Sequence, residues 1–260
     1  MLNNVGLNRR KFIGGAIASV FAATTLSTTA LAQDSDVMSE QVKIAMAYRQ
    51  ASAPTQSQAI LDKVNNRLYL VSQSGEVIHN INVLTGNLKR DDLDEVNAQG
   101  GITPAGHFAG IEVAYQPFLD PQKYEGQIAI NFIERPDGSR AIALHSTLNT
   151  TSNEDNIADN NAQNNNVSKG CIRISRDKDW GNVFLFFATS GQGGYASFND
   201  FQSKVKVEKQ QPENAQAEVV MKSQVRLVVL PEQDVSRANT LRYIQQPSEK
   251  SLDIGMIAAP

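Results

Sequence analysis

The residues best suited to chemistry in this 260-residue chain are its one cysteine, Cys171, and a histidine, His145, 26 positions before it. His145 ends an apolar, strand-like run, and Cys171 follows Gly170 in a short turn sequence. A nearby imidazole or helix N-terminus raises the thiolate fraction of a cysteine. Gly170 permits a backbone shape that brings turn amides close to a reacting carbonyl, and Arg173 could hold a carboxylate in a two-pronged contact. Two interpretations follow: acyl transfer by the thiol, or a cysteine that serves as a small buried apolar residue.

The first 32 residues predict an export signal. Two arginines and a lysine at 9–11 precede an apolar stretch at 12–31, and Ala-Leu-Ala at 30–32 fits a cleavage site between small residues. Paired arginines in this context are typical of a twin-arginine signal. An uncleaved membrane anchor is the other interpretation, but the stretch is weakly apolar for a stable span. We therefore expect cleavage before Gln33 and a periplasmic location.

Composition excludes several classes of function. Residues 1–32 hold three of the 24 Lys and Arg residues and none of the 27 Asp and Glu residues, so cleavage moves the formal charge from −3 to −6. Nothing in this charge favours nucleic-acid binding. One cysteine and three histidines cannot form a cysteine-rich zinc site, and no glycine-rich phosphate loop occurs. An exported chain with one cysteine also has no partner for an intramolecular disulfide.

The rest of the chain predicts a mainly β protein. Short runs rich in Val, Ile, Leu and aromatic residues, bounded by turn residues, predict strands at 59–64, 67–72, 76–83, 108–115, 127–134, 140–145 and 219–230. The first three form a β-meander. Helices are expected at 40–49 and at 178–189, the second capped by Ser175 or Asp177. Its residues Trp180, Phe184 and Phe187 are spaced to bury one face.

Polar segments indicate where the domain and its loops begin and end. Residues 149–166 contain eight asparagines in 18 positions, too polar to pack, and predict a mobile flap between the two chemistry-bearing residues. Residues 192–216 are interpreted as a looped insertion. We expect a helix and linker at 33–56, one catalytic domain at 57–232, and a C-terminal tail at 233–260.

The turn at the cysteine resembles the signature of L,D-transpeptidase catalytic domains, the YkuD-type fold. That signature is a histidine after an apolar strand, then Ser-His-Gly-Cys, an apolar residue, and Arg or Asn. Here it reads Ser168-Lys169-Gly170-Cys171-Ile172-Arg173. The opening meander, the Thr-Pro-Ala-Gly-His-Phe run at 103–108 and the strand at 225–229 resemble further landmarks in the same order. The resemblance covers residues 57–232 and implies a mixed β-sandwich with few short helices.

The resemblance implies a cysteine-dependent peptidoglycan transpeptidase. Cys171 would attack the carbonyl between the diamino acid and D-alanine of a tetrapeptide stem, and the acyl-enzyme would pass to an amine acceptor. The acceptor could be a stem peptide, a lipoprotein or a free D-amino acid. His145 would activate the thiol, Gly170 and neighbouring amides would hold the oxyanion, and Arg173 would orient the site or a stem carboxylate. No metal or organic cofactor is implied, and carbapenems are the expected covalent inhibitors.

The sequence departs from the family pattern at Lys169, which stands where a second histidine is usual. The lysine could favour the thiolate, or it could be a solvated surface residue. We expect Ser168 to hydrogen-bond within the turn, and His107 to have a structural role or to lie at the rim of the site.

Three other functions stay open. Water in place of the amine would give an L,D-carboxypeptidase or endopeptidase, and a degenerate site would give a non-catalytic peptidoglycan-binding envelope protein. A sortase also combines His, Cys and Arg, but the Ser-x-Gly-Cys turn and the meander argue against it.

Overall fold

The structure is a computed structural model, and it describes residues 38–86, 101–116, 119–134, 140–147, 151–158, 168–189, 199–201, 203, 219–231 and 237–245. These residues lie within one compact unit, Val37–Pro260. The predicted export signal lies outside the described residues. None of the helices in the described part of the chain is both long and apolar enough to cross a bilayer.

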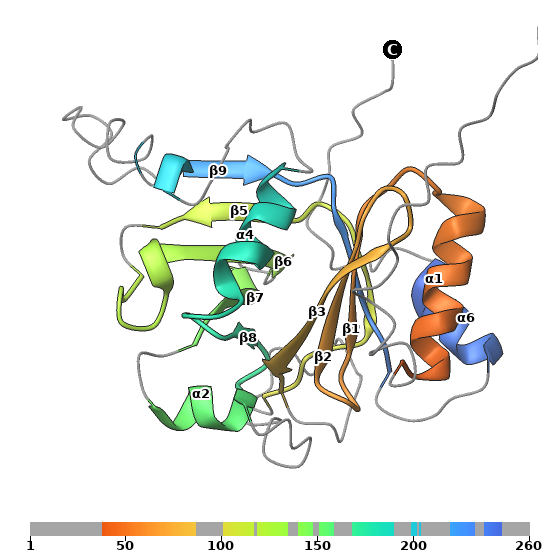
Figure 1. Cartoon of the computed structure of the whole chain (residues 1–260), viewed down its shortest axis with the longest axis horizontal. Coiled ribbons are helices and arrows are strands. Elements are labelled where there is room, and N and C mark those ends of the chain that lie inside the picture. Colours follow the sequence, from red (N-terminus) through yellow and green to blue (C-terminus); the bar gives the residue numbers. More distant parts are fainter. Residues whose placement is uncertain are drawn as a thin grey trace, which may run out of the picture. The chain divides into compact units, whose positions relative to one another are not determined.

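The fold is mainly β, as predicted, with a curled mixed sheet and few short helices (Figure 1). Its order in the described residues is β4-β10-β1-β2-β3-β8-β7-β6-β5-β9. Two neighbouring pairs are parallel, β1 with β10 and β7 with β8, and the other pairs are antiparallel. The bounds are β1 Gln58–Asp62, β2 Arg67–Val71, β3 Val77–Leu84, β4 Gly106–Phe108, β5 Glu112–Tyr115, β6 Ile128–Glu134, β7 Arg140–Ser146, β8 Ile172–Ile174, β9 Val219–Lys222 and β10 Arg226–Val229.

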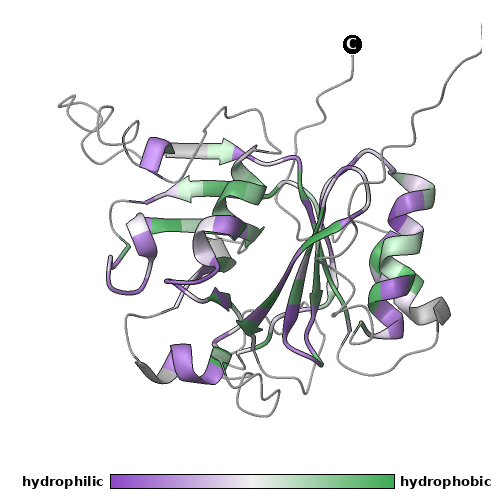
Figure 2. Cartoon of the chain, viewed as in Figure 1, coloured by the Kyte–Doolittle hydropathy of each residue, from purple (hydrophilic) through white to green (hydrophobic). Residues whose placement is uncertain are grey.

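Strand β3 joins the two halves of the sheet, and the main core fills the space between those halves. Leu68 and Leu70 of β2 enter this core, which also contains Ile130 of β6 and Phe184 of helix α4 (Trp180–Thr189). The intervening residue Tyr69 points to the opposite face, as the period of a strand requires. Figure 2 shows β2 and β6 as largely hydrophobic bands, which fits strands buried on both faces.

Helices α1 (Glu40–Ser52) and α6 (Arg237–Gln245) share a second core with β1, β2 and β10. Helix α1 was predicted at 40–49, and Ser39 caps it by accepting a hydrogen bond from the Val42 N–H at 3.3 Å. Helix α6 lies inside the segment that the sequence indicated only as a tail. Its Ile244 is buried in this second core. A nine-residue helix depends on such tertiary contacts, so its sequence pattern is weak.

Two predicted strands are each divided in the structure. The expected strand at 219–230 forms β9, which pairs with β5, and β10, which lies between β1 and β4. The expected strand at 108–115 likewise forms β4 and β5. The two breaks meet, because the Ser223 N–H donates to the Ile111 carbonyl at 2.8 Å. Both are corners where the chain passes from one half of the sheet to the other.

The prediction of a mobile flap at 149–166 is wrong for residues 151–158. Residues Thr151–Ala158 form helix α2, mainly hydrophilic in Figure 2. Its Ile157 is 3% exposed, and the Ile157 carbonyl accepts a hydrogen bond from the Asn82 amide of β3 at 3.0 Å. One apolar side chain and a few hydrogen bonds therefore hold a segment that composition alone indicated could not pack. Residues 149–150 and 159–166 lie outside the described residues.

The insertion predicted at 192–216 is described only in part. Residues 199–201 are helical rather than looped. Phe201 is fully buried, with its ring centroid 5.1 Å from that of Phe184. The aromatic side chain is the reason this short piece packs on the core. Trp180, Phe184 and Phe187 of α4 are buried as predicted.

Candidate active site

The parallel strands β7 and β8 bring the predicted site residues together. Their register pairs Leu144 with Ile172 and His145 with Arg173. Leu144 and Ile172 are fully buried in the main core, so His145 and Arg173 face the other way. Cys171 directly precedes β8, two positions before Arg173, and alternation puts it on that same side. The histidine, the thiol and the guanidinium thus converge at one edge of the main core.

His145 is held in the form that a general base requires. Its ring is 6% exposed, and Nδ1 lies 2.7 Å from the Ser146 carbonyl oxygen. A carbonyl only accepts, so Nδ1 carries the proton and Nε2 keeps its lone pair. Burial lowers the pKa of His145 to about 4; backbone groups of Ser146 and Lys123 raise it, and Arg173 lowers it. The imidazole is therefore neutral at neutral pH and able to accept a proton.

Tyr124 is a site residue that the sequence did not reveal. Its ring centroid lies 4.5 Å from that of His145, with the planes tilted by 46°. Burial raises the pKa of the Tyr124 phenol, the charge of Cys171 raises it further, and Arg173 lowers it. Tyr124 thus lies close enough to Cys171 and to Arg173 for their charges to change its pKa. Its surroundings, Asp-Pro-Gln-Lys-Tyr-Glu-Gly, have no periodic pattern, so no sequence signal indicated this position.

The loop that carries Tyr124 is fastened to the ends of β7 and β8. The Glu125 N–H donates to the Ser146 hydroxyl at 2.7 Å. Arg176 lies 3.1 Å from the Glu125 carboxylate and donates to the Gln122 carbonyl at 2.9 Å. These contacts fix the tyrosine ring against the imidazole.

The turn before Cys171 closes on the Ser168 side chain, as predicted. The Ser168 hydroxyl donates to the Cys171 carbonyl at 2.5 Å and accepts from the Gly170 N–H at 3.1 Å. Gly170 has φ +104°, and a Cβ there would lie 2.5 Å from the Ile102 carbonyl oxygen. Only glycine fits such a position. Because its N–H is engaged inside the turn, Gly170 contributes backbone shape here rather than the expected oxyanion donor.

A buried polar network holds the turn in place. The Thr103 hydroxyl donates to the Gly170 carbonyl at 2.7 Å, and the ammonium group of Lys63, fully buried, donates to the Thr103 carbonyl at 2.9 Å. The Ser168 N–H donates to the Thr85 carbonyl at 2.9 Å. The turn that carries Cys171 therefore rests on the residue after β1, on the end of β3 and on the segment before β4.

Comparison with known proteins decides the family. Residues 56–184 match the model of the L,D-transpeptidase catalytic domain, YkuD. This segment is an L,D-transpeptidase catalytic domain. Six solved chains also match, among them an L,D-transpeptidase from Xylanimonas cellulosilytica DSM 15894, at 14% identity and TM-score 0.27. That match covers 68% of this chain and 62%, less than two thirds, of the other. No curated protein matches the chain.

Two charged residues near Cys171 in this L,D-transpeptidase domain have different surroundings. Lys169 is exposed, which agrees with a solvated surface lysine. Arg173 is half-buried, and its Nε has no hydrogen-bond partner among the described residues. A buried guanidinium nitrogen without an acceptor is costly, so Arg173 is suited to receive an anionic group. His107 lies on β4 instead and lines a separate pocket with α1 and α6.

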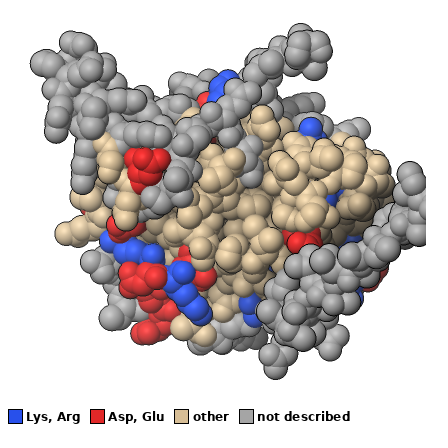
Figure 3. All heavy atoms as spheres, turned by 45° about the horizontal axis from the view of Figure 1, so that its top comes forward, with Lys and Arg blue, Asp and Glu red and all other residues tan. Residues whose placement is uncertain are grey.

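The charged and metal-ligating side chains of the described residues do not gather into a second centre. On the face drawn in Figure 3, the acidic and basic side chains of the described residues are intermixed. Within the described residues, no group of three His, Cys, Asp or Glu side chains could hold a metal ion.

Helix α2 ties together the ends of both strands that bear the site. The Glu154 carboxylate accepts hydrogen bonds from the Thr147 hydroxyl, from the Ser175 hydroxyl at 2.6 Å and from the Arg176 N–H at 3.0 Å. Thr147 follows β7 and Ser175 follows β8. Burial raises the pKa of Glu154, but these hydrogen bonds lower it more, so its net pKa is below the usual value. The segment between His145 and Cys171 thus holds the ends of β7 and β8 together through Glu154.

Proposed function

We propose that the chain is an exported peptidoglycan L,D-transpeptidase in which Cys171 is the nucleophile and His145 is the base. The observation that carries this proposal is the β7–β8 register, which sets His145 beside Arg173, two residues after Cys171, on one face. The Nδ1 contact to Ser146 adds the tautomer that the chemistry needs. Membership of residues 56–184 in the family supports the substrate class.

The proposed reaction has two acyl transfers. His145 Nε2 takes the thiol proton as the Cys171 sulfur attacks the carbonyl between the diamino acid and D-alanine of the stem. The C–N bond breaks, His145 returns the proton to the leaving amine, and a thioester remains. An acceptor amine then attacks the thioester, loses a proton to His145, and the thiol reforms. Because His145 is neutral, proton transfer accompanies attack rather than preceding it.

Arg173 and the turn would assist this chemistry. The partner-less Nε of Arg173 favours a role in holding a stem carboxylate near the thiol. The backbone of the rigid turn around Cys171 supplies the amides expected to hold the oxyanion. Exposed Lys169 is proposed to have no part in bond breaking.

A carbapenem tests the nucleophile directly. We expect intact-protein mass spectrometry to show one covalent adduct on the wild type and none on Cys171→Ala. His145→Gln should slow adduct formation without removing Cys171. Unmodified wild-type protein at saturating drug would refute the proposal and leave the non-catalytic peptidoglycan-binding protein.

The acceptor is tested with tetrapeptide muropeptides. Transpeptidation predicts cross-linked dimers, or exchange of the terminal D-alanine for an added D-amino acid. Tripeptide products without dimers or exchange would show that water is the acceptor and would make the enzyme an L,D-carboxypeptidase. A lipoprotein acceptor would be seen as a lysine-linked muropeptide.

The proposal that the protein is exported is based on the sequence of the first 32 residues. We propose passage through the twin-arginine pathway, cleavage before Gln33 and a periplasmic location. Replacing Arg9 and Arg10 by lysine should retain the protein in the cytoplasm. N-terminal sequencing of the periplasmic form should begin at Gln33.

A further inference from the structure

A polar cluster lies on the face of the sheet that α1 and α6 cover, apart from the residues of the candidate active site. It comes from three neighbouring strands, Gln58 on β1, Arg226 on β10 and His107 on β4. The register pairs Gln58 with Arg226 and His107 with Val228. Because Arg226 and Val228 share a face, the three polar side chains lie together beside the second core, which contains Val228.

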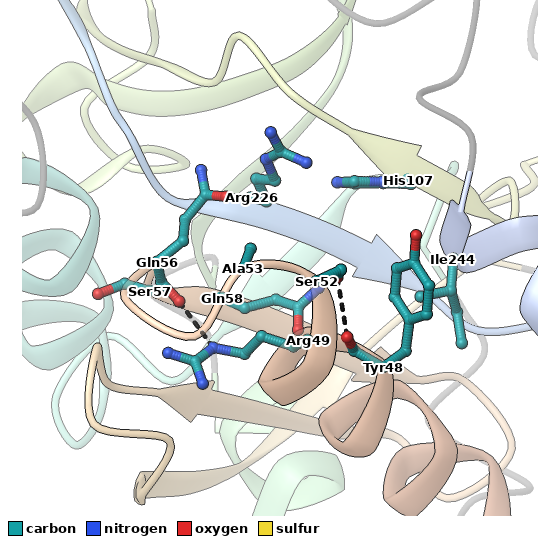
Figure 4. Close-up of a pocket in the computed structure, with 10 residues that line it drawn as sticks. All are labelled: Tyr48, Arg49, Ser52, Ala53, Gln56, Ser57, Gln58, His107, Arg226 and Ile244. Carbon is teal, nitrogen blue, oxygen red and sulfur yellow. Dashed lines mark hydrogen bonds between the residues drawn. The ribbon is translucent and has the colours of Figure 1, made fainter.

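These side chains surround a small pocket (Figure 4). Its volume is about 20 Å³, and one water requires about 10–15 Å³. The pocket is therefore suited to a small polar group rather than to a sugar. Its lining residues, none of them acidic, are Tyr48, Arg49, Ser52, Ala53, Gln56, Ser57, Gln58, His107, Arg226 and Ile244.

Two buried side chains in the pocket lack hydrogen-bond partners. His107 is 4% exposed, and neither ring nitrogen has a partner with good hydrogen-bond geometry among the described residues, although the Ile244 backbone lies close enough to raise its pKa. Gln58 is 6% exposed, and its Oε1 has none either. In Figure 4 the His107 ring and the Arg226 guanidinium point toward one another, and the Tyr48 hydroxyl points toward His107. Buried polar atoms without partners indicate that another group completes the site.

The two arginines of the pocket have different tasks. Arg49 is 3% exposed and donates to the Gln56, Ser72 and Gln73 carbonyls at 2.7–2.9 Å, so it builds the wall. Arg226 forms no ion pair within the described residues.

His107 is neutral at neutral pH. Burial lowers the pKa of His107 to about 4, with Arg226 lowering it too and the Ile244 backbone raising it. The neutral imidazole keeps one N–H to donate beside the guanidinium.

We propose that this pocket binds the carboxylate group of a small organic acid. Arg226 supplies the charge, and His107 and Tyr48 donate hydrogen bonds to the carboxylate oxygens. The Gln58 amide can present either its nitrogen or its oxygen by rotation. A cation is disfavoured by Arg226, because no acidic side chain of the described residues lines the pocket.

Histidine NMR of the full chain tests the site, because the sequence has only three histidines, His79, His107 and His145. Acetate is added at constant ionic strength and neutral pH to protein labelled with ¹⁵N-histidine. We expect a saturable shift of the His107 ring signals and none at His79 or His145. Acetamide, which has the same shape without charge, should give no shift.

Arg226→Gln should weaken acetate binding by roughly tenfold to a hundredfold, the value of one charge-assisted hydrogen bond. Lys222→Gln, which removes an exposed positive charge from β9, should leave it unchanged. Arg226→Lys should bind acetate more weakly than wild type and more tightly than Arg226→Gln, and it replaces the glutamine variant if that variant fails to fold.

Three results would overturn the proposal. The first is no saturable His107 shift in the wild type, which would mean that water alone fills the pocket. The second is an equal shift with acetamide. The third is a stronger response to inorganic phosphate than to acetate. Retention of carbapenem acylation in Arg226→Gln is expected, since the pocket lies apart from Cys171.

Discussion

Replacing Glu154 by glutamine tests whether α2 holds the site in place. The carboxylate of Glu154 receives three hydrogen bonds, from two hydroxyls and one backbone N–H. Glutamine has almost the same shape but turns one accepting oxygen into a donating NH₂ group. If the NH₂ group faces the Arg176 N–H, two donors meet. If it faces Ser175, the hydroxyl can turn to accept from it, but the hydrogen bonds to a charged carboxylate are replaced by weaker neutral ones. The two strand ends lose part of their common anchor.

The expected loss of stability follows from these contacts. A hydrogen bond to a charged group contributes about 1.5–3 kcal/mol, and a buried donor left without an acceptor costs about 1–3 kcal/mol. Partial exposure of Glu154 places the change at the lower end, about 2 kcal/mol. With a urea dependence of about 1–3 kcal/mol per molar for a protein of this size, the unfolding midpoint should fall by about 1 M.

Urea unfolding followed by fluorescence provides the measurement, because the single tryptophan, Trp180, is buried in the core. The matched control is Asp155→Asn, which removes a neighbouring carboxylate that is exposed. Carbapenem acylation should also slow in Glu154→Gln and not in the control. Equal midpoints and equal acylation rates for the two variants would refute this role of Glu154.

The pH dependence of this difference has a definite sign. The folded pKa of Glu154 lies below its unfolded value of about 4.3. The stability that the carboxylate adds is therefore fully present above that value and disappears as pH falls through the folded pKa. The midpoints of wild type and Glu154→Gln should converge under acid conditions. A difference that stays constant with pH would show that shape rather than charge is responsible.

The remaining predictions concern the turn, the base and the tyrosine. Gly170→Ala should cost about 1–3 kcal/mol in strain and slow acylation at least tenfold; normal acylation would show that the turn relaxes. His145 should stay neutral down to about pH 4, so the acylation rate should show no acid limb near pH 6.5. Stability should fall between about pH 6.5 and 4, by up to about 1.4 kcal/mol per pH unit for each buried histidine, because unfolded His107 and His145 bind protons there first; calorimetry at several pH values checks this. Tyr124→Phe should keep the ring contact and acylate normally, whereas Tyr124→Ala should lose orientation of His145; equal rates would remove Tyr124 from the site.

Much of the fold could be predicted because strands and helices carry local patterns. The alternation and turn residues of β1 to β3, and the apolar face of α4, are visible in the sequence. The corners at Ser223 and Ile111 were not. Their positions depend on contacts between the two sheet halves. Helix α6 was missed for the same reason, since its packing on α1 and on the neighbouring strands stabilises it.

The candidate site also has residues that the sequence could predict and residues that it could not. Cys171, His145 and Arg173 belong to recognisable local patterns, and the β7–β8 register brings them together. Tyr124 and Glu154 could not be found, because each acts through contacts with residues distant in sequence. The asparagine-rich composition around Glu154 indicated a mobile segment, whereas three hydrogen bonds to one carboxylate hold its helix. Composition measures average polarity, and this contact depends on a single side chain.

The parallel pairing of β7 with β8 limits how far the chain between them can be shortened. Two parallel neighbours need a crossover of about a dozen residues or more, because the chain must leave the end of one strand and return to the start of the next. Residues 147–171 are that crossover. Deletions that shorten this crossover should therefore remove residues from 159–166 and retain Thr151–Ala158. Removal of the whole crossover would force β8 out of its register with β7. The length of the segment between His145 and Cys171 is thus partly a topological requirement of the parallel pairing.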